Sequence, residues 1–205
     1  DLLGFGDPSI GRLEGIFKEI ADLSVEDDGI LFDSSSVRGA PIRAEARYSG
    51  IRIEMIAKLD SAKLTLQIDI GFGDDFRDDP EEVSLPSLLD MPSPILRAYR
   101  RETVLAEKLE AVVQLGLLNT RLKDYFDFWF LGQNFAFDGS KLTSSIAATF
   151  ACRKTSLPVE MPRGLTEAYW TDPARIAAWN SFWKKAGVVS EKPQLEEVVR
   201  FVASF

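Results

Sequence analysis

Apolar residues follow two different periodicities in the first third of the chain. They recur at helical spacing from Ile10 to Leu23, which predicts an amphipathic helix over residues 8–22. Apolar and polar residues then alternate over 51–59 and again over 64–70, a pattern typical of half-buried strands. The short turn at 60–62 predicts that these two strands form an antiparallel hairpin.

The proline-rich segment 85–94 interrupts these patterns, and we interpret it as a linker. Beyond it the spacing of apolar residues is helical almost to the end of the chain. Helices are expected over 101–117, 120–132, 140–152, 173–186 and 194–204. The sequence therefore predicts an α+β protein, with an α/β part over residues 1–90 and a helical domain over residues 91–205.

The composition is that of a folded protein. Of its 205 residues, 45% are hydrophobic and 27% are charged, which is enough apolar surface for a core. No apolar run approaches the roughly 18 residues of a membrane-spanning helix, and no signal segment opens the chain, so we expect a cytoplasmic protein. Cys152 is the single cysteine, which suits a reducing compartment.

The sequence contains no histidine. This excludes Ser-His-Asp and Cys-His catalysis, most zinc sites and the usual proton shuttle near neutral pH. Any chemistry must therefore use carboxylates, lysine, arginine or hydroxyl groups, with an oxygen-bound metal ion as the natural helper.

Charge is unevenly distributed along the chain. Residues 1–94 contain 9 Lys and Arg against 20 Asp and Glu, whereas residues 95–205 contain 15 against 12. A nucleic acid, if one binds, would have to dock on the second half, because phosphate contacts supply most of such affinity. The acidic segment 73–82 can equally be a solvated loop that keeps the protein soluble.

Two similar segments place an aspartate before a glycine-rich turn. Asp69 lies near the carboxyl end of a predicted strand, on the face opposite its apolar residues, and Gly-Phe-Gly-Asp follows shortly after. The chain opens on the same pattern, with Asp1 before Leu-Leu-Gly-Phe-Gly-Asp; it has no initiator methionine, so we expect further sequence upstream. The two aspartates could face one metal site, or each could be a solvent-exposed residue beside a turn.

Lys108 occupies an unusual position on the predicted helix 101–117. On a helical wheel it falls inside the apolar arc, between Val112 and Leu115, while Glu107 and Glu110 lie on the polar face. A lysine there either extends its ammonium group to the rim or presents it to an anion in a cleft.

The next helix, 120–132, is apolar nearly all round and is expected to be buried. Its polar side chains Lys123, Asp124 and Asp127 share one narrow wedge, with Lys123 four residues before Asp127. Buried carboxylates are retained when they are paired or used. This wedge is therefore either a structural ion-pair network or the wall of an active site.

Three segments together resemble the AbiEii/AbiGii toxin family of nucleotidyltransferases: DLLGFGDPS, LQIDIGFGD, and MPSPILRAYRRETVLAEKLEAVVQLGLLNTRLKDYFDFWFL. The resemblance covers most of residues 1–155, and its AEKLEA and NTRLKDYFD blocks are specific. It implies a small mixed sheet with flanking helices, as in the minimal nucleotidyltransferase fold, followed by a helical C-terminal domain. It also implies transfer of a nucleoside monophosphate from an NTP with release of pyrophosphate.

The resemblance further implies roles for single residues. Asp1 and Asp69 match acidic positions that would hold Mg²⁺, and Lys108 matches the lysine of an Ala-Glu-Lys helix and would neutralise phosphate charge. Arg121 and Lys123 would bind the nucleotide together with Lys108.

Asp124 and Asp127 match the family's Lys-Asp-x-x-Asp block, in which one of them would orient Lys108 or the acceptor hydroxyl. The family's glycine-rich phosphate-binding segment and the first aspartate of its Asp-x-Asp pair have no counterpart in residues 1–205. We therefore expect this chain by itself to be poorly active.

The partners implied are an NTP, an RNA acceptor and a cognate antitoxin encoded nearby, as in toxin–antitoxin or phage-defence pairs, and no membrane. Two other hypotheses remain open at this point. The chain could be a catalytically degenerate relative that binds a nucleotide or a protein, or the charged residues could serve only as structural salt bridges.

Overall fold

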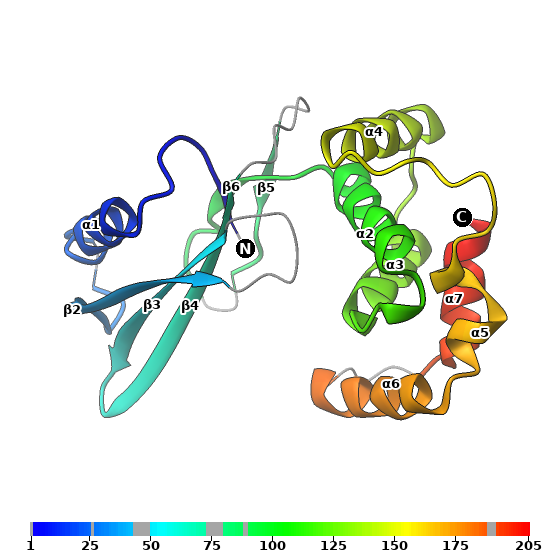
Figure 1. Ribbon diagram of the computed structural model, residues 1–205. Helices are drawn as coiled ribbons and strands as arrows, with labels where there is room; N and C mark the ends of the chain where they lie inside the picture. The colour runs from blue at the N-terminus through cyan, green and yellow to red at the C-terminus, as the bar shows by residue number, and fades with distance from the viewer. Residues whose placement is uncertain (1, 26, 43–49, 73–79, 88–89, 188–191) are drawn as a thin grey trace. The chain divides into compact units, whose positions relative to one another are not determined.

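A computed structural model describes residues 2–25, 27–42, 50–72, 80–87, 90–187 and 192–205. The chain divides into two compact units, Asp1–Asp75 and Phe76–Phe205. The first contains a mixed sheet and a helix, and the second contains a small hairpin and the remaining helices (Figure 1). The expected α+β class, with a small mixed sheet followed by helices, is confirmed.

The first unit is built on a four-stranded sheet in the order β1-β4-β3-β2. Its elements are β1 (Leu2–Gly4), α1 (Ile10–Ala21), β2 (Ile30–Ile42), β3 (Gly50–Leu59) and β4 (Ala62–Phe72). The predicted hairpin is the antiparallel pair β3 and β4, while β1 runs parallel to β4. The two Gly-Phe-Gly segments therefore begin on neighbouring strands.

Helix α1 covers one face of this sheet (Figure 1). Its period places Leu13 and Phe17 on the buried side, and Glu14 Oε1 accepts a hydrogen bond from the backbone N–H of Gly39 on β2 at 2.7 Å. The apolar side of the sheet completes this core with Val37, Ile51, Ile53, Met55, Ile70 and Phe72. Asp69 and Gly71 consequently face away from the core, as the alternation predicts.

Strand β2 was not anticipated from the sequence. Its pairing with β3 is broken by a register shift between Asp33 and Arg38. Within the bulge, the hydroxyl of Ser36 donates to the carbonyl of Asp33 at 2.6 Å and accepts from the N–H of Ile56 at 2.8 Å. A side chain thus satisfies the backbone groups that the bulge removes from the ladder.

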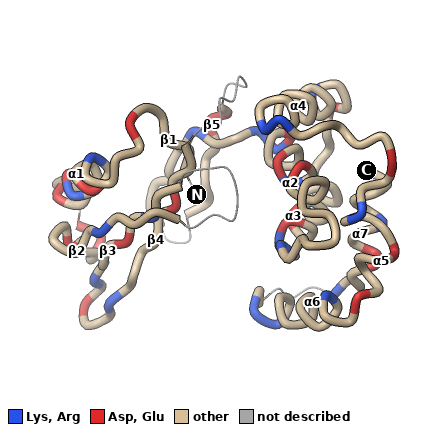
Figure 2. Tube along the Cα trace, in the orientation of Figure 1, with Lys and Arg blue, Asp and Glu red and all other residues tan. Residues whose placement is uncertain are grey.

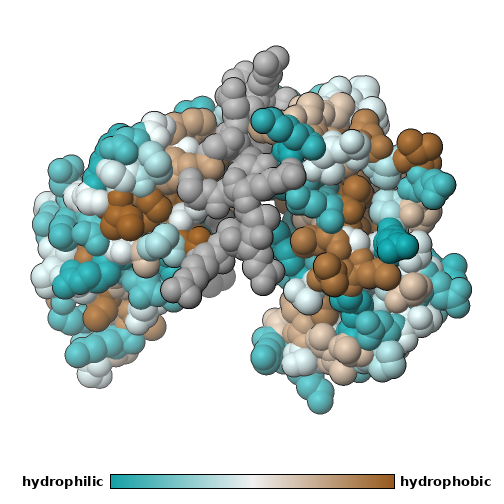
Figure 3. All heavy atoms as spheres, in the orientation of Figure 1, coloured by the Kyte–Doolittle hydropathy of each residue, from teal (hydrophilic) through white to brown (hydrophobic). Residues whose placement is uncertain are grey.

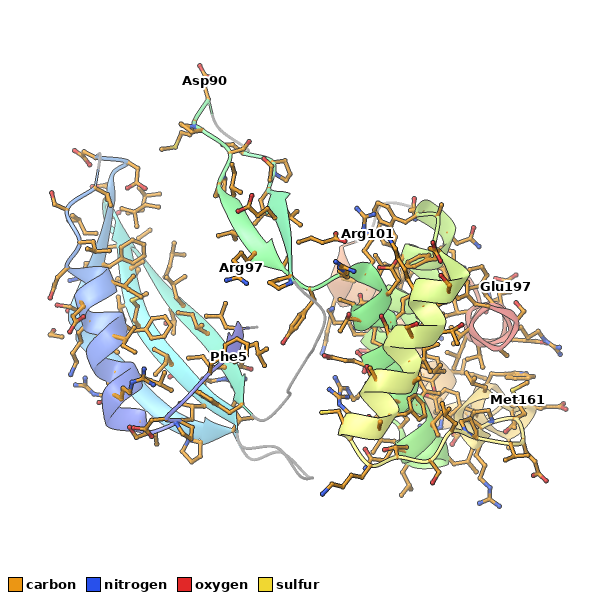
Figure 4. All side chains as sticks on the ribbon, turned by 90° about the horizontal axis from the view of Figure 1, so that it is seen from above. Phe5, Asp90, Arg97, Arg101, Met161 and Glu197 are labelled. Atoms are coloured by element: carbon orange, nitrogen blue, oxygen red, sulfur yellow. The ribbon has the colours of Figure 1, made fainter. Side chains whose placement is uncertain are left out.

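The second unit begins with the antiparallel pair β5 (Glu81–Ser84) and β6 (Ile95–Ala98). The segment 85–94, which we had interpreted as a linker, connects these two strands, and the N–H of Leu85 donates to the carbonyl of Pro94 at 2.9 Å. Both of its ends therefore belong to one hairpin. Arg97 on β6 and Arg101 at the start of the next helix are labelled in Figure 4.

The longer helices of this unit match the predicted ranges closely: α2 (Arg101–Leu115), α3 (Leu122–Asn134), α4 (Gly139–Cys152), α6 (Pro173–Ala186) and α7 (Leu195–Ser204). The unit also contains the short helix α5 (Glu167–Trp170), which was not predicted, and 3-10 turns at Gly116–Leu118 and Arg163–Leu165. The pairing of α2 with α4 can be followed in Figure 4. None of the helices that the structure describes is long and apolar enough to cross a membrane.

The core of the second unit is rich in aromatic side chains. Tyr125 and Phe128 of α3 are buried against α5, α6 and α7, where Tyr169 and Trp179 are almost fully inaccessible. Helix α3 was expected to be buried, but Phe130 on it is 45% exposed. Apolar residues are visible on the surface of both units (Figure 3).

Candidate functional site

The amino group of Lys108 lies between two carboxylates of the neighbouring helix. Lys108 is in the middle of α2, and its Nζ donates to Asp124 Oδ1 at 3.0 Å and to Asp127 Oδ2 at 2.7 Å on α3. The two aspartates are three residues apart and so lie on one side of α3. Both aspartates of the Lys-Asp-x-x-Asp block are thus direct partners of Lys108.

Two further cations complete this cluster, which we call the α2–α3 charge cluster: Lys108, Arg121, Lys123, Asp124 and Asp127. Arg121 Nε lies 2.7 Å from Asp124 Oδ2, a close ionic contact without hydrogen-bond geometry. Lys123 Nζ donates to Asp127 Oδ2 at 2.6 Å, so one carboxylate oxygen serves two ammonium groups. Three cations therefore surround two carboxylates. Figure 2 shows that α2 and α3 both carry basic and acidic residues.

The cluster has a buried base and an exposed cationic rim. The side chains of Lys108 and Asp124 are 15% and 6% exposed, whereas those of Arg121 and Lys123 are 61% and 72% exposed. The lysine therefore does not extend to bulk solvent; it is held inside an ion-pair network. The accessible cations are the guanidinium and ammonium groups that stand at the start of α3.

The start of α3 adds to the electrostatics of the cluster. The helix begins at Leu122, with Arg121 at its N-cap position and Asp124 in its first turn. Unpaired backbone N–H groups at a helix start carry partial positive charge, which favours a carboxylate or a phosphate there. The cluster therefore combines three features that bind anions, namely a helix start and two exposed cations.

Glu110 is a buried acid that the helical wheel assigned to the polar face of its helix. Its side chain is 2% exposed because that face of α2 packs against α4. Its Oε2 lies 3.1 Å from Nη1 of Arg153, and its Oε1 accepts from the hydroxyl of Thr155. This pair joins α2 to the end of α4. Its partners are 43 residues apart in the sequence, so local periodicity could not predict it.

Asp69 stands on the open face of the first sheet, opposite Arg52 on β3. Arg52 donates from Nε to Asp69 Oδ1 at 2.7 Å and from Nη2 to Oδ2 at 2.8 Å. These hydrogen bonds hold the pKa of the Asp69 carboxyl below its usual range, against the opposing effect of its burial. Asp69 is therefore ionised at neutral pH and already has a partner that sequence reasoning missed.

The close approach of β1 to β4 explains one glycine of the repeated segment. A Cβ atom on Gly4 would lie 2.4 Å from the ring of Phe72, and glycine alone avoids that overlap. Leu2 and Leu3 pair with Ile70 and Gly71 in parallel register. Asp1 lies outside the described residues, so the predicted pairing of Asp1 with Asp69 stays a prediction.

Among the described residues, Asp69 is the carboxylate that the family resemblance assigns to the expected magnesium ion. Among them, no group of three or more His, Cys, Asp or Glu could hold a metal ion. Asp69 offers a single carboxylate, and a guanidinium group occupies both of its oxygens. Magnesium accepts one or two protein carboxylates when substrate phosphates and water complete its shell, but the cation of Arg52 competes for this one.

Asp69 belongs to the first unit and the α2–α3 charge cluster to the second. The first unit offers a carboxylate on the open face of a mixed sheet. The second offers a half-buried lysine between two aspartates with exposed cations beside it. Carboxylates and cations are the side-chain types that phosphoryl transfer uses when histidine is absent.

The family comparison agrees with these features. Residues 1–200 match the model of the nucleotidyl transferase AbiEii toxin family, a family of type IV toxin–antitoxin systems. The chain belongs to this family. No curated protein and no solved structure matches it significantly.

Proposed function

We propose that this chain is the nucleotidyltransferase toxin of a toxin–antitoxin pair and transfers a nucleoside monophosphate from an NTP to an RNA acceptor. The observation that supports this most directly is the α2–α3 charge cluster. Its lysine is fixed by two carboxylates in a half-buried position, while Arg121 and Lys123 present exposed charge beside a helix start. Three cations face two carboxylates, so the cluster keeps one positive charge that an anion can balance.

The proposed roles follow from burial and charge. Arg121 and Lys123 bind the phosphates of the NTP, because they are the accessible cations of the cluster. Asp124 and Asp127 orient Lys108, whose ammonium neutralises charge that develops on the phosphates during transfer. An oxygen of a phosphate can replace Asp127 Oδ2 as the partner of Lys123, since that oxygen is already shared by two ammonium groups.

In the proposed reaction, an acceptor hydroxyl oxygen forms a bond to the α-phosphorus of the NTP. The bond from that phosphorus to the bridging oxygen of the β-phosphate breaks, pyrophosphate leaves, and the hydroxyl proton passes to a carboxylate or to water. With no histidine in the chain, Asp69, Asp124 and Asp127 are the carboxylates proposed to take part. Magnesium, which the family resemblance implies, would add positive charge on the phosphates.

A second candidate function is supported by one specific observation. Every carboxylate proposed for catalysis already has a basic partner, namely Arg52 for Asp69 and Lys108 for both aspartates of α3. A degenerate relative that binds a nucleotide or an antitoxin without catalysis would show the same pairs. The two functions are distinguished by whether the nucleoside monophosphate is transferred to an acceptor. Nucleotide binding alone does not distinguish them.

The deciding experiment compares two buried ion pairs of the same helix. The protein, with any encoded sequence that precedes Asp1, is incubated with α-labelled NTP, RNA and Mg²⁺, as wild type, Lys108→Met and Glu110→Gln. Glu110→Gln is the control because it also disturbs a buried charge of α2 but lies outside the cluster. We expect label on RNA in wild type and Glu110→Gln and none in Lys108→Met. Nucleotide binding without transfer in wild type would instead support the degenerate relative.

A further inference from the structure

The segment that leads into α3 is held by a carbonyl group with two side-chain donors. The backbone oxygen of Asn119 accepts from the hydroxyl of Tyr169 at 3.0 Å and from Nη1 of Arg175 at 2.7 Å. Asn119 is fully buried, so this oxygen has no access to water. Two donors use both of its lone pairs, which leaves the carbonyl fully satisfied in one orientation.

The side chain of Asn119 extends this restraint to the charge cluster. Its Oδ1 accepts from the N–H of Arg121 at 2.8 Å, and the N–H of Asp124 donates to the carbonyl of Arg121 at 2.9 Å. Through these hydrogen bonds, the position of Asn119 determines the positions of Arg121 and of the first turn of α3. A shift of the Asn119 carbonyl would move the exposed cation and the buried carboxylate together.

Arg175 is held in position by several contacts. Its side chain is only 14% exposed, its guanidinium carbon lies 4.5 Å from the centre of the Tyr169 ring, and its Nε lies 3.6 Å from Asp172 Oδ2. Tyr169 stacks in turn on Tyr125 of α3 at 4.9 Å between ring centres. The planar guanidinium can stack on the ring and donate to the carbonyl at once, which an ammonium group cannot do.

The tyrosines are fixed as hydrogen-bond donors. Burial raises the pKa of Tyr169, so its hydroxyl keeps its proton at physiological pH and donates to Asn119. The hydroxyl of Tyr125 donates to the carbonyl of Gly164 at 3.0 Å. The stacked pair therefore ties α3 and α5 into one rigid support behind the cluster.

We propose that Arg175, together with Tyr169, is a positioning residue for the α2–α3 charge cluster: it fixes the Asn119 carbonyl and thereby sets where Arg121 and Asp124 stand. This inference rests on the proposed function for its effect on transfer. Its structural part, the ordering of the turn 119–121, does not depend on that function. Arg175 acts through Asn119 and has no assigned contact with a substrate.

The test uses three variants of the whole chain. Arg175→Gln removes the cation, and Tyr169→Phe removes one donor while it keeps the stacked ring. Arg200→Gln is the matched control, because Arg200 also stacks on an aromatic ring, that of Trp170 at 4.9 Å, and is ion-paired to Glu196 at 2.8 Å, but makes no contact with the turn.

Amide hydrogen exchange is the first readout. We expect exchange at the N–H groups of Arg121 and Asp124 to accelerate about tenfold in Arg175→Gln, less in Tyr169→Phe, and not in Arg200→Gln. Unchanged exchange at these amides in Arg175→Gln overturns the inference. This readout decides the inference even if the wild-type protein transfers no label, a result that would overturn the proposed function alone.

A double-mutant cycle on transfer is the second readout for an active protein. Arg175→Gln should lower kcat/KM for the NTP about tenfold in the wild-type background and less than twofold in an Arg121→Gln background. Such coupling is expected if Arg175 acts through Arg121. A general loss of stability would instead lower kcat/KM by the same factor in both backgrounds. Equal losses in the two backgrounds overturn the positioning role.

Discussion

Arg52 donates hydrogen bonds to both carboxylate oxygens of Asp69 on the adjacent strand, with Nε–Oδ1 and Nη2–Oδ2 distances of 2.7 and 2.8 Å. The two residues are directly opposite one another in the antiparallel pair of β3 and β4, so the geometry follows from strand register. This two-point pairing fixes the orientation of the Asp69 carboxylate. It also gives Asp69 a competitor for any metal ion.

The Asp69–Arg52 pair should make stability depend on pH in the acidic range. The folded-state pKa of Asp69 is lowered by its hydrogen bonds to Arg52, so the pair stabilises the fold fully above the ordinary carboxyl pKa of about 4. This contribution is lost as the pH falls through the lowered pKa. Urea unfolding at several pH values should show wild type more stable than Asp69→Asn at pH 7, with the difference shrinking below about pH 4.

A difference between wild type and Asp69→Asn that stays constant down to pH 2 would contradict the assignment. Asp7→Asn is a suitable control, because Asp7 is an exposed aspartate of the same unit whose carboxylate accepts from nearby Ser9, while Arg12 donates to its backbone carbonyl and not to the carboxylate.

Removal of Arg52 should reveal whether Asp69 can bind magnesium. If the guanidinium competes with Mg²⁺ for the carboxylate, Arg52→Gln should tighten Mg²⁺ binding several-fold, and Asp69→Asn should abolish it. Isothermal titration with MgCl₂ in the presence of a non-hydrolysable NTP measures both effects. Equal Mg²⁺ affinity in wild type, Arg52→Gln and Asp69→Asn would exclude Asp69 as a ligand.

Loss of Lys108 should destabilise the second unit only moderately. Lys108→Met leaves Asp124 and Asp127 nearly buried, but Arg121 and Lys123 remain beside them. We therefore expect a loss of about 1–3 kcal/mol, below the roughly 3–5 kcal/mol of a buried charge left with no partner. Thermal unfolding measures this, with Glu110→Gln, whose Arg153 keeps Glu107 as a neighbour, as the comparison.

A similar stability of the two variants would make their transfer assays directly comparable. Complete unfolding of Lys108→Met at 25 °C would contradict the view that the other cations compensate, and it would favour a structural role for the lysine.

The turn between α2 and α3 should depend on Gly116. This residue has φ 51° and ψ −127°, a backbone conformation that side chains with a Cβ atom adopt only with strain. Gly116→Ala should therefore lower the free energy of unfolding by about 1–3 kcal/mol. Gly139→Ala, where a Cβ would meet nothing within 4 Å, should change it by less than about 0.5 kcal/mol in the same urea titration.

Periodicity predicted the regular elements well, because they carry one apolar face each. The hairpin of β3 and β4 and the helices α1, α2, α3, α4, α6 and α7 were all expected near their observed bounds. Strand β2 was missed because its bulge and its serine run break the alternation. The short strands β5 and β6 were missed because segment 85–94 was interpreted as a linker instead of a hairpin connection.

The candidate site shows the same division. Lys108, Asp124 and Asp127 could be predicted as a group, since a lysine in an apolar arc and two acids on a mostly apolar helix each require a partner. The partners that come from distant segments were not predictable. Arg52 meets Asp69 through strand register, and Arg153 meets Glu110 because α4 packs on the polar face of α2.

The sequence by itself determined the long helices and the hairpin of β3 and β4, that catalysis by histidine is absent, and which charged residues lie where a charge needs a partner. These properties follow from the local order of residue types, which periodicity and composition read directly. The tertiary structure alone decided that the carbonyl of Asn119 is shared by Tyr169 and Arg175, 50 and 56 residues further along the chain. Such contacts depend on how separate helices pack, because they join residues that are far apart in the sequence.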